Sequence, residues 1–121
     1  MEDKKALVIS GFPAARSRFS AALQSLHGLF AVVFEEGTFR AALLRAPSCD
    51  VIVVDDVVAE GGVGPGEVKQ LRGAMKGGAK LLVCIEPGLA QEGVLKMVGA
   101  DAVLSRNEVS EKTLLRALGE V

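Results

Sequence analysis

The sequence predicts an α/β fold in which a parallel sheet of five strands carries helices on both faces. Short apolar runs rich in β-branched residues alternate five times with segments of helical periodicity along the 121 residues. The first, third and fourth runs lack polar residues at alternate positions, which is typical of strands buried on both faces of a parallel sheet. We therefore expect one domain over residues 1–121, built from strand–helix units with right-handed crossovers.

The predicted strands are short and end at turn-forming or charged residues. The third run, Val51-Ile52-Val53-Val54, shows the pattern most clearly, because it leads directly into two aspartates. We place the strands near residues 5–10, 30–34, 50–55, 80–85 and 101–105.

Five segments between and after these runs have apolar residues at helical spacing. Pro13 suits the first turn of the first helix, and Gly28 suits its end. Thr38 and Ser110 are candidate N-caps for the second and fifth helices, and Gly99 is expected to end the fourth. The apolar stripes comprise Phe19, Ala22, Leu23 and Leu26; Phe39, Ala42 and Leu43; Val68, Leu71 and Met75; Ala90, Val94, Met97 and Val98; and Leu114, Leu115 and Leu118.

Composition and charge exclude several classes of function. Lys and Arg number 14 against 15 Asp and Glu, so the net charge of −1 gives no basic footprint for nucleic acid or for a membrane surface. No apolar run approaches the roughly 20 residues of a membrane span. The two cysteines, Cys49 and Cys84, form no metal-binding pattern, and we expect a cytoplasmic protein without a disulfide.

The acidic pair Asp55-Asp56 follows the third predicted strand directly. Ligands of such sheets bind beyond the carboxyl ends of the strands, so the pair lies at the edge where chemistry is expected. A carboxylate at a strand end can also serve only as a turn residue that binds loop amides. The glycine-rich segment 61–66 contains Pro65 and lacks a following Lys-Ser/Thr, which argues against a phosphate-binding loop and favours a long connecting loop.

Nearly the whole chain resembles the receiver domain of bacterial two-component response regulators. Residues 4–16, KKALVISGFPAAR, stand where the family typically reads KKILIVDDDPAVR, and residues 49–55, CDVIVVD, stand where it reads PDLVLLD. Residues 99–108, GADAVLSRNE, correspond to GADDYLTKPF. The resemblance implies the flavodoxin-like fold, a three-layer sandwich whose strand order is 2-1-3-4-5.

Most of the family's functional positions are changed in this chain. Asp55 stands at the position of the phosphoacceptor aspartate, but Ser10 and Gly11 replace the acidic pair that binds magnesium. Cys84 replaces the hydroxyl residue that contacts the phosphoryl group, and Ile85 replaces the small residue behind it. Magnesium requires hard oxygen ligands and a thiol is a weak donor, so each change weakens phosphotransfer.

The fifth strand and the residue after it depart from the family as well. Val103 stands in place of the switch aromatic, and Arg106 in place of the lysine. Arg106 can be an ordinary surface charge, but its family position favours an ion pair with Asp55. Asp56 either joins the site or points away from it.

The resemblance implies a receiver-like signalling domain of a phosphorelay, and the losses favour a degenerate member, a pseudo-receiver. We expect no enzymatic activity, no cofactor, and a protein–protein interaction module that needs no phosphate. Its partner is expected to be another protein, other domains of a longer chain, or a second copy that docks on the fourth helix, fifth strand and fifth helix. On this face Met97, Val98 and Leu118 are either partly exposed or, as is commoner for such residues, packed into the core. The alternative is a working receiver that a histidine kinase phosphorylates at Asp55, with Asp56 or Glu86 completing an atypical Mg²⁺ site.

Overall fold

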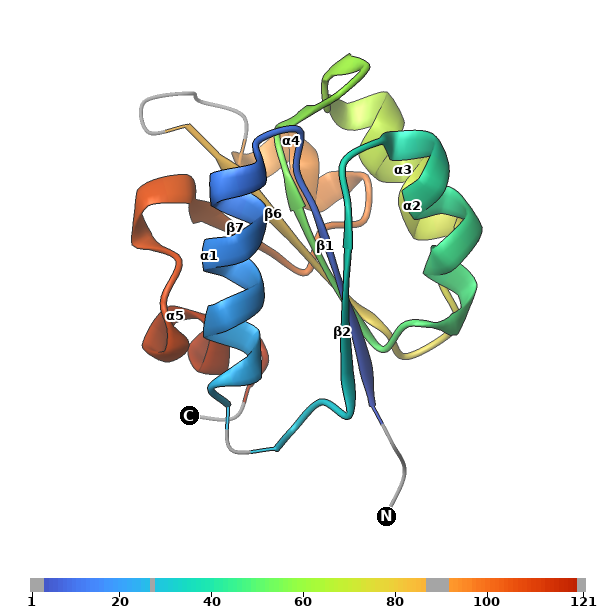
Figure 1. Ribbon diagram of the computed structural model, residues 1–121. Helices are drawn as coiled ribbons and strands as arrows, with labels where there is room; N and C mark the ends of the chain where they lie inside the picture. The colour runs from blue at the N-terminus through green and yellow to red at the C-terminus, as the bar shows by residue number, and fades with distance from the viewer. Residues whose placement is uncertain (1–3, 27, 87–91, 120–121) are drawn as a thin grey trace.

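The computed structural model describes residues 4–26, 28–86 and 92–119, and it has the predicted five-stranded parallel sheet at its centre (Figure 1). The strands lie in the order β2-β1-β3-β6-β7, which is the order 2-1-3-4-5 when only the strands of this sheet are counted. Every neighbouring pair in the sheet is parallel. Its strands are β1 (Lys5–Ile9), β2 (Val32–Glu36), β3 (Val51–Asp55), β6 (Lys80–Ile85) and β7 (Ala102–Ser105).

Helices cover both faces of the sheet, as the unalternated apolar runs predict. The helices are α1 (Pro13–Gln24), α2 (Phe39–Arg45), α3 (Pro65–Ala74), α4 (Glu92–Met97) and α5 (Glu111–Ala117), with single 3₁₀ turns at Ala46–Ser48 and Arg106–Glu108. One hydrophobic core lies between the sheet and α1 and α5, around Phe19, Leu23 and Leu114. The other lies between the sheet and α2, α3 and α4, around Leu71 and Leu95.

The helices begin where the sequence places their caps. Pro13 occupies the first turn of α1, where its missing N–H costs no hydrogen bond. The hydroxyl of Thr38 accepts a hydrogen bond from the Ala41 amide at 3.1 Å, and that of Ser110 accepts one from the Thr113 amide at 3.3 Å. Ala90, expected in the fourth helix, lies outside the described residues.

The second strand is displaced from its expected position. It runs from Val32 to Glu36 rather than over residues 30–34. In the register with β1, Val32 pairs with Lys5 and Glu36 pairs with Ile9. As an edge strand it tolerates polar residues, and Glu35 is exposed while the central strand β3 is buried throughout. The apolar run therefore predicted that a strand is present but placed its two ends two residues too early.

The glycine-rich segment is not the plain connecting loop that the sequence predicts. Val57–Val58 (β4) and Gly61–Gly62 (β5) pair antiparallel in a short hairpin directly after β3. Gly61 adopts a φ of 128°, which glycine reaches without strain. Val58 is buried in the core against α2 and α3, so the hairpin is attached to the domain by its own side chain.

The expected docking face is only partly exposed. Met97 is 87% exposed and Val94 is 48% exposed on α4, whereas Val98 is partly buried. Of the two alternatives left open for Leu118, the structure shows core packing, since Leu118 lies in the core beneath α1 and α5. None of the described helices is long and apolar enough to cross a membrane.

The two cysteines are free and buried. Cys84 lies beside Asp55 in the register of β3 and β6, while Cys49 precedes Val51 at the opposite end of β3. They therefore lie at opposite ends of neighbouring strands, too far apart for a disulfide, which confirms the prediction that none forms.

Candidate functional site

Asp55 is the last residue of β3 and its side chain is completely buried at the carboxyl end of the sheet. The equally buried Ser10, which directly follows the neighbouring strand β1, donates a hydrogen bond from its hydroxyl to Asp55 Oδ2 at 2.7 Å. The Asp56 amide donates to Asp55 Oδ1 at 2.9 Å. A buried carboxylate must be paired or hydrogen-bonded to stay ionised, and these donors satisfy part of that requirement.

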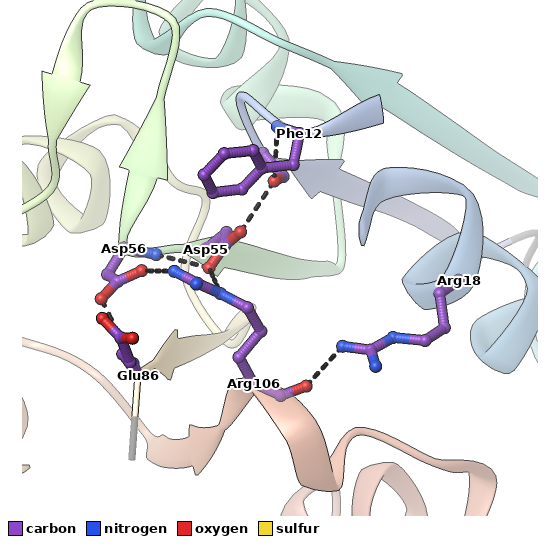
Figure 2. A network of polar contacts seen from close by, with 7 residues as sticks. Phe12, Arg18, Asp55, Asp56, Glu86 and Arg106 are labelled. Carbon is purple, nitrogen blue, oxygen red and sulfur yellow. Dashed lines mark hydrogen bonds and ion pairs between the residues drawn. The ribbon is translucent and has the colours of Figure 1, made fainter. Parts of the chain in front are cut away.

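Arg106 supplies the opposite charge (Figure 2). Its Nε donates to Asp55 Oδ1 at 2.7 Å, and its Nη2 donates to Asp56 Oδ1. One guanidinium thus bridges both members of the acidic pair, using the fixed fork geometry that lysine lacks. The predicted ion pair between Arg106 and Asp55 is present, and Asp56 joins the site rather than pointing away from it.

Further contacts hold the arginine in place. The guanidinium carbon lies 5.4 Å from the centre of the Phe12 ring, and the Phe12 amide donates to the Ser10 hydroxyl at 3.1 Å. Arg18 of α1 donates to the Arg106 carbonyl at 2.6 Å. Figure 2 shows the resulting network, which joins β1, α1, β3 and the end of β7 around one carboxylate.

Burial and the neighbouring charges shift the pKa values of Asp55 and Arg106 in opposite directions. Burial raises the pKa of Asp55 above its ordinary value, and the hydrogen bonds from Ser10 and Arg106 oppose this without cancelling it. Burial also lowers the pKa of Arg106, but the hydrogen bond and charge of Asp55 outweigh it and raise that pKa overall. The arginine therefore stays charged, and the carboxylate depends on it to remain ionised.

The side chains at the other predicted site positions make no hydrogen bond to Asp55 or Arg106 among the contacts found in the described residues. Cys84 is buried against the α1 and α5 core, and burial raises the pKa of its thiol far above the ordinary value, so the thiol is inert. Ile85 and Val103 pack on the opposite face, against the core beneath α2, α3 and α4. Glu86 is exposed, and it is its backbone amide that binds Asp56 Oδ2, at 3.3 Å.

The residues present do not fit a magnesium ion. No group of three or more His, Cys, Asp or Glu in the described part of the chain has the geometry to hold a metal. Asp55 Oδ1 and Asp56 Oδ1 are already bound to a guanidinium. A Cβ on Gly11 would lie 2.8 Å from the backbone carbon of Val58, so the hairpin occupies the space that a carboxylate side chain at this position would need.

Sequence reasoning did not identify Phe12 and Arg18 as parts of the site, and it treated Ser10 only as a lost ligand. Phe12 is the third residue after β1 and lies at the same sheet edge as Asp55, so an aromatic residue at this position was a usable signal. Arg18 had no such signal, because its contact with the Arg106 carbonyl spans 88 residues of sequence.

Solved structures share this architecture across almost the whole chain. A response regulator protein from Burkholderia pseudomallei, solved with a phosphorylated aspartic acid, has a TM-score of 0.79 at 23% identity over 96% of this chain. A CheY-like receiver domain from Methylobacillus flagellatus gives 0.77 at 20% over 98%, and the chemotaxis response regulator CheY4 of Vibrio cholerae gives 0.75 at 24% over 98%. This chain has the receiver-domain fold.

Two comparisons at the level of sequence found no match for this chain. No protein-family profile matches the chain. No curated protein sequence matches it significantly. The chain spans 98% of the Methylobacillus and Vibrio structures, but 66% of the Burkholderia protein and 59% of the response regulator RcsB from Salmonella typhimurium, which are longer.

Proposed function

We propose that this chain is a degenerate receiver domain, a pseudo-receiver, of a two-component phosphorelay that acts as a cytoplasmic protein–protein interaction module without being phosphorylated. The observation that carries the proposal is the state of Asp55: both of its oxygens are hydrogen-bonded, and its charge is matched by Arg106. The module needs no cofactor and performs no catalysis of its own.

Phosphoryl transfer to a carboxylate needs a free oxygen in line with the leaving group and a cation that neutralises the transferring phosphoryl group. Here Asp55 Oδ1 accepts both the Asp56 amide and Arg106 Nε, and Oδ2 accepts the Ser10 hydroxyl, so an attack by either oxygen competes with buried hydrogen bonds. Arg106 is itself bound to Asp56, which removes the second carboxylate that a metal would use. These contacts support a site in which the charge of Arg106, rather than a metal ion, compensates the charge of the carboxylates.

The surface of α4, β7 and α5 is the best candidate for the partner. Met97 at 87% exposure and Val94 at 48% exposure present large apolar side chains on α4. The network around Arg106 joins the end of β7 to β3 and α1, which holds this surface in one arrangement. The partner is a second copy, another protein or a further domain of a longer chain, and it recognises this surface without a phosphorylation signal.

The proposal is tested by exposing the whole chain to acetyl phosphate and, separately, to beryllofluoride, each with excess Mg²⁺. We expect the intact mass to stay unchanged and ¹⁹F NMR to show no bound beryllofluoride. The Burkholderia pseudomallei response regulator, solved with a phosphorylated aspartic acid, controls for acetyl phosphate, and the DrrB receiver domain, solved in its BeF3-activated form, controls for beryllofluoride. Gain of one phosphate that the substitution Asp55→Asn abolishes would overturn the proposal and establish the working receiver instead.

A further inference from the structure

The hairpin β4–β5 is tied to three other parts of the molecule. The Gly11 amide, just beyond β1, donates to the Val57 carbonyl at 2.8 Å. The Ala59 amide donates to the Gly37 carbonyl at 2.9 Å, and the Val63 amide donates to the Asp56 carbonyl at 2.6 Å. These bonds run from the acidic pair to Gly37, two residues before α2, so the hairpin crosses the carboxyl edge of the sheet. In Figure 1 this segment lies at the top of the molecule.

Glu60, at the tip of this hairpin, connects the hairpin to the start of α2. Its Oε1 accepts the Phe39 amide at 2.8 Å and its Oε2 accepts the Arg40 amide at 3.1 Å. Phe39 and Arg40 are the first residues of α2, whose amides have no partners within the helix. The two amide hydrogen bonds lower the pKa of Glu60 below its ordinary value, so the carboxylate is ionised at neutral pH.

Gly11 and the hairpin fit each other closely. A Cβ on Gly11 would lie 2.8 Å from the Val58 backbone carbon and 3.1 Å from the Ala59 nitrogen, so only glycine allows the hairpin to lie where it does. On its other side, the hairpin contributes Val58, Glu60 and Gly62 to a groove of about 340 Å³ beside α2 and α3. The hairpin thus separates the edge of the Asp55 site from a groove on the surface.

We propose that residues 57–62 form a latched strap: Glu60 fastens the strap to α2, and the fastened strap fills the space beside Gly11 at the edge of the Asp55 site. The strap and the start of α2 open and close as one unit. A contact that pulls Glu60 from the α2 amides at the groove therefore also clears the space beside Gly11. No phosphorylation step is involved, so the inference does not depend on the chemistry of Asp55.

The test uses amide hydrogen exchange by NMR on the whole chain and perturbs the strap from each end. Glu60→Ala removes the latch, and Gly11→Ala pushes on the strap from the sheet edge without touching α2. Gly73→Ala is the matched control, because a Cβ there meets no atom within 4 Å beyond its chain neighbours and the backbone of its own helix. The amides of Gly11 and Ala59 report the strap, those of Phe39 and Arg40 report the start of α2, and that of Val53 in the central strand reports global unfolding.

If the strap is one unit, Glu60→Ala raises exchange at Gly11 and Ala59 about fivefold, the factor expected from losing one helix cap. Gly11→Ala raises exchange at Phe39 and Arg40 by more than the rise at Val53 that overpacking of the whole fold produces. The Gly73→Ala protein shows no rise at any of these amides. If Glu60→Ala affects only Phe39 and Arg40, Glu60 is a helix cap alone and the proposal is wrong. Glu60→Ala decides the question by itself if Gly11→Ala does not fold, because Glu60 is exposed.

Discussion

Replacing Arg106 with alanine is expected to leave the carboxylate of Asp55 buried without its counter-charge. Asp55 is 0% exposed and the Arg106 side chain is 19% exposed. Breaking a buried ion pair by removing one partner typically costs about 3–5 kcal/mol. Because Asp55 keeps the Ser10 hydroxyl and the Asp56 amide, and because the guanidinium is partly hydrated, we expect about 3 kcal/mol, the lower end of that range.

The effect of Asp55→Asn on the free energy of unfolding is expected to change sign when Arg106 is absent. In the wild type, Asp55→Asn removes the charge but keeps an oxygen acceptor, and Arg106 keeps Asp56, so we expect a loss of about 1 kcal/mol. In the Arg106→Ala background the same substitution removes an uncompensated buried charge, and it is expected to restore about 1–2 kcal/mol. The same change therefore destabilises one protein and stabilises the other.

The assay is urea denaturation at pH 7, followed by circular dichroism, for the wild type, both single variants and the double variant. Lys96→Ala is the control, since Lys96 and Glu92 form an exposed pair with side chains 50% and 60% accessible. Such a pair is worth less than about 0.5 kcal/mol. If Asp55→Asn costs the same free energy with and without Arg106, the two residues are not coupled and the reasoning about the site fails.

Three more predictions follow from the same geometry. Because the folded-state pKa of Asp55 is raised, folding favours its protonated form; its contribution to stability is present below about pH 4, the unfolded value, and is lost as pH rises through the folded pKa. Asp55→Asn should remove this part of the pH dependence in denaturation curves measured between pH 3 and pH 7, and identical curves would contradict it. Gly11→Asp is expected to destabilise the fold by about 2 kcal/mol or more through overpacking against the Val58 backbone, whereas Gly66→Asp, in open space, should cost little; equal effects in thermal denaturation would argue against the close fit. Met97→Glu should weaken self-association in light scattering or partner capture at least tenfold while leaving the thermal midpoint unchanged, and intact binding would move the docking surface elsewhere.

The sequence alone determined that a parallel sheet lies between two layers of helices in this protein. Apolar runs such as Val51-Ile52-Val53-Val54 lack alternation because both faces of their strand are covered, and this local pattern predicts a parallel sheet without knowledge of any contact. Caps such as Thr38 and Ser110 act within three residues of themselves, so they too could be identified from the sequence. The place of Asp55 at the carboxyl edge followed from the strand direction alone.

The family position of Arg106 predicted its ion pair with Asp55, but only the tertiary structure decided the other contacts around this carboxylate. The Ser10 hydroxyl reaches it across 45 residues of sequence and Arg106 across 51, and no local pattern states that a serine will donate or that one guanidinium will bridge two carboxylates. The hairpin depended equally on distant contacts, since its backbone lies where it does because Gly11 has no Cβ and because Glu60 reaches the start of α2. Periodicity reports which face of a segment is buried; which polar groups then meet at an edge depends on the packing of several segments at once.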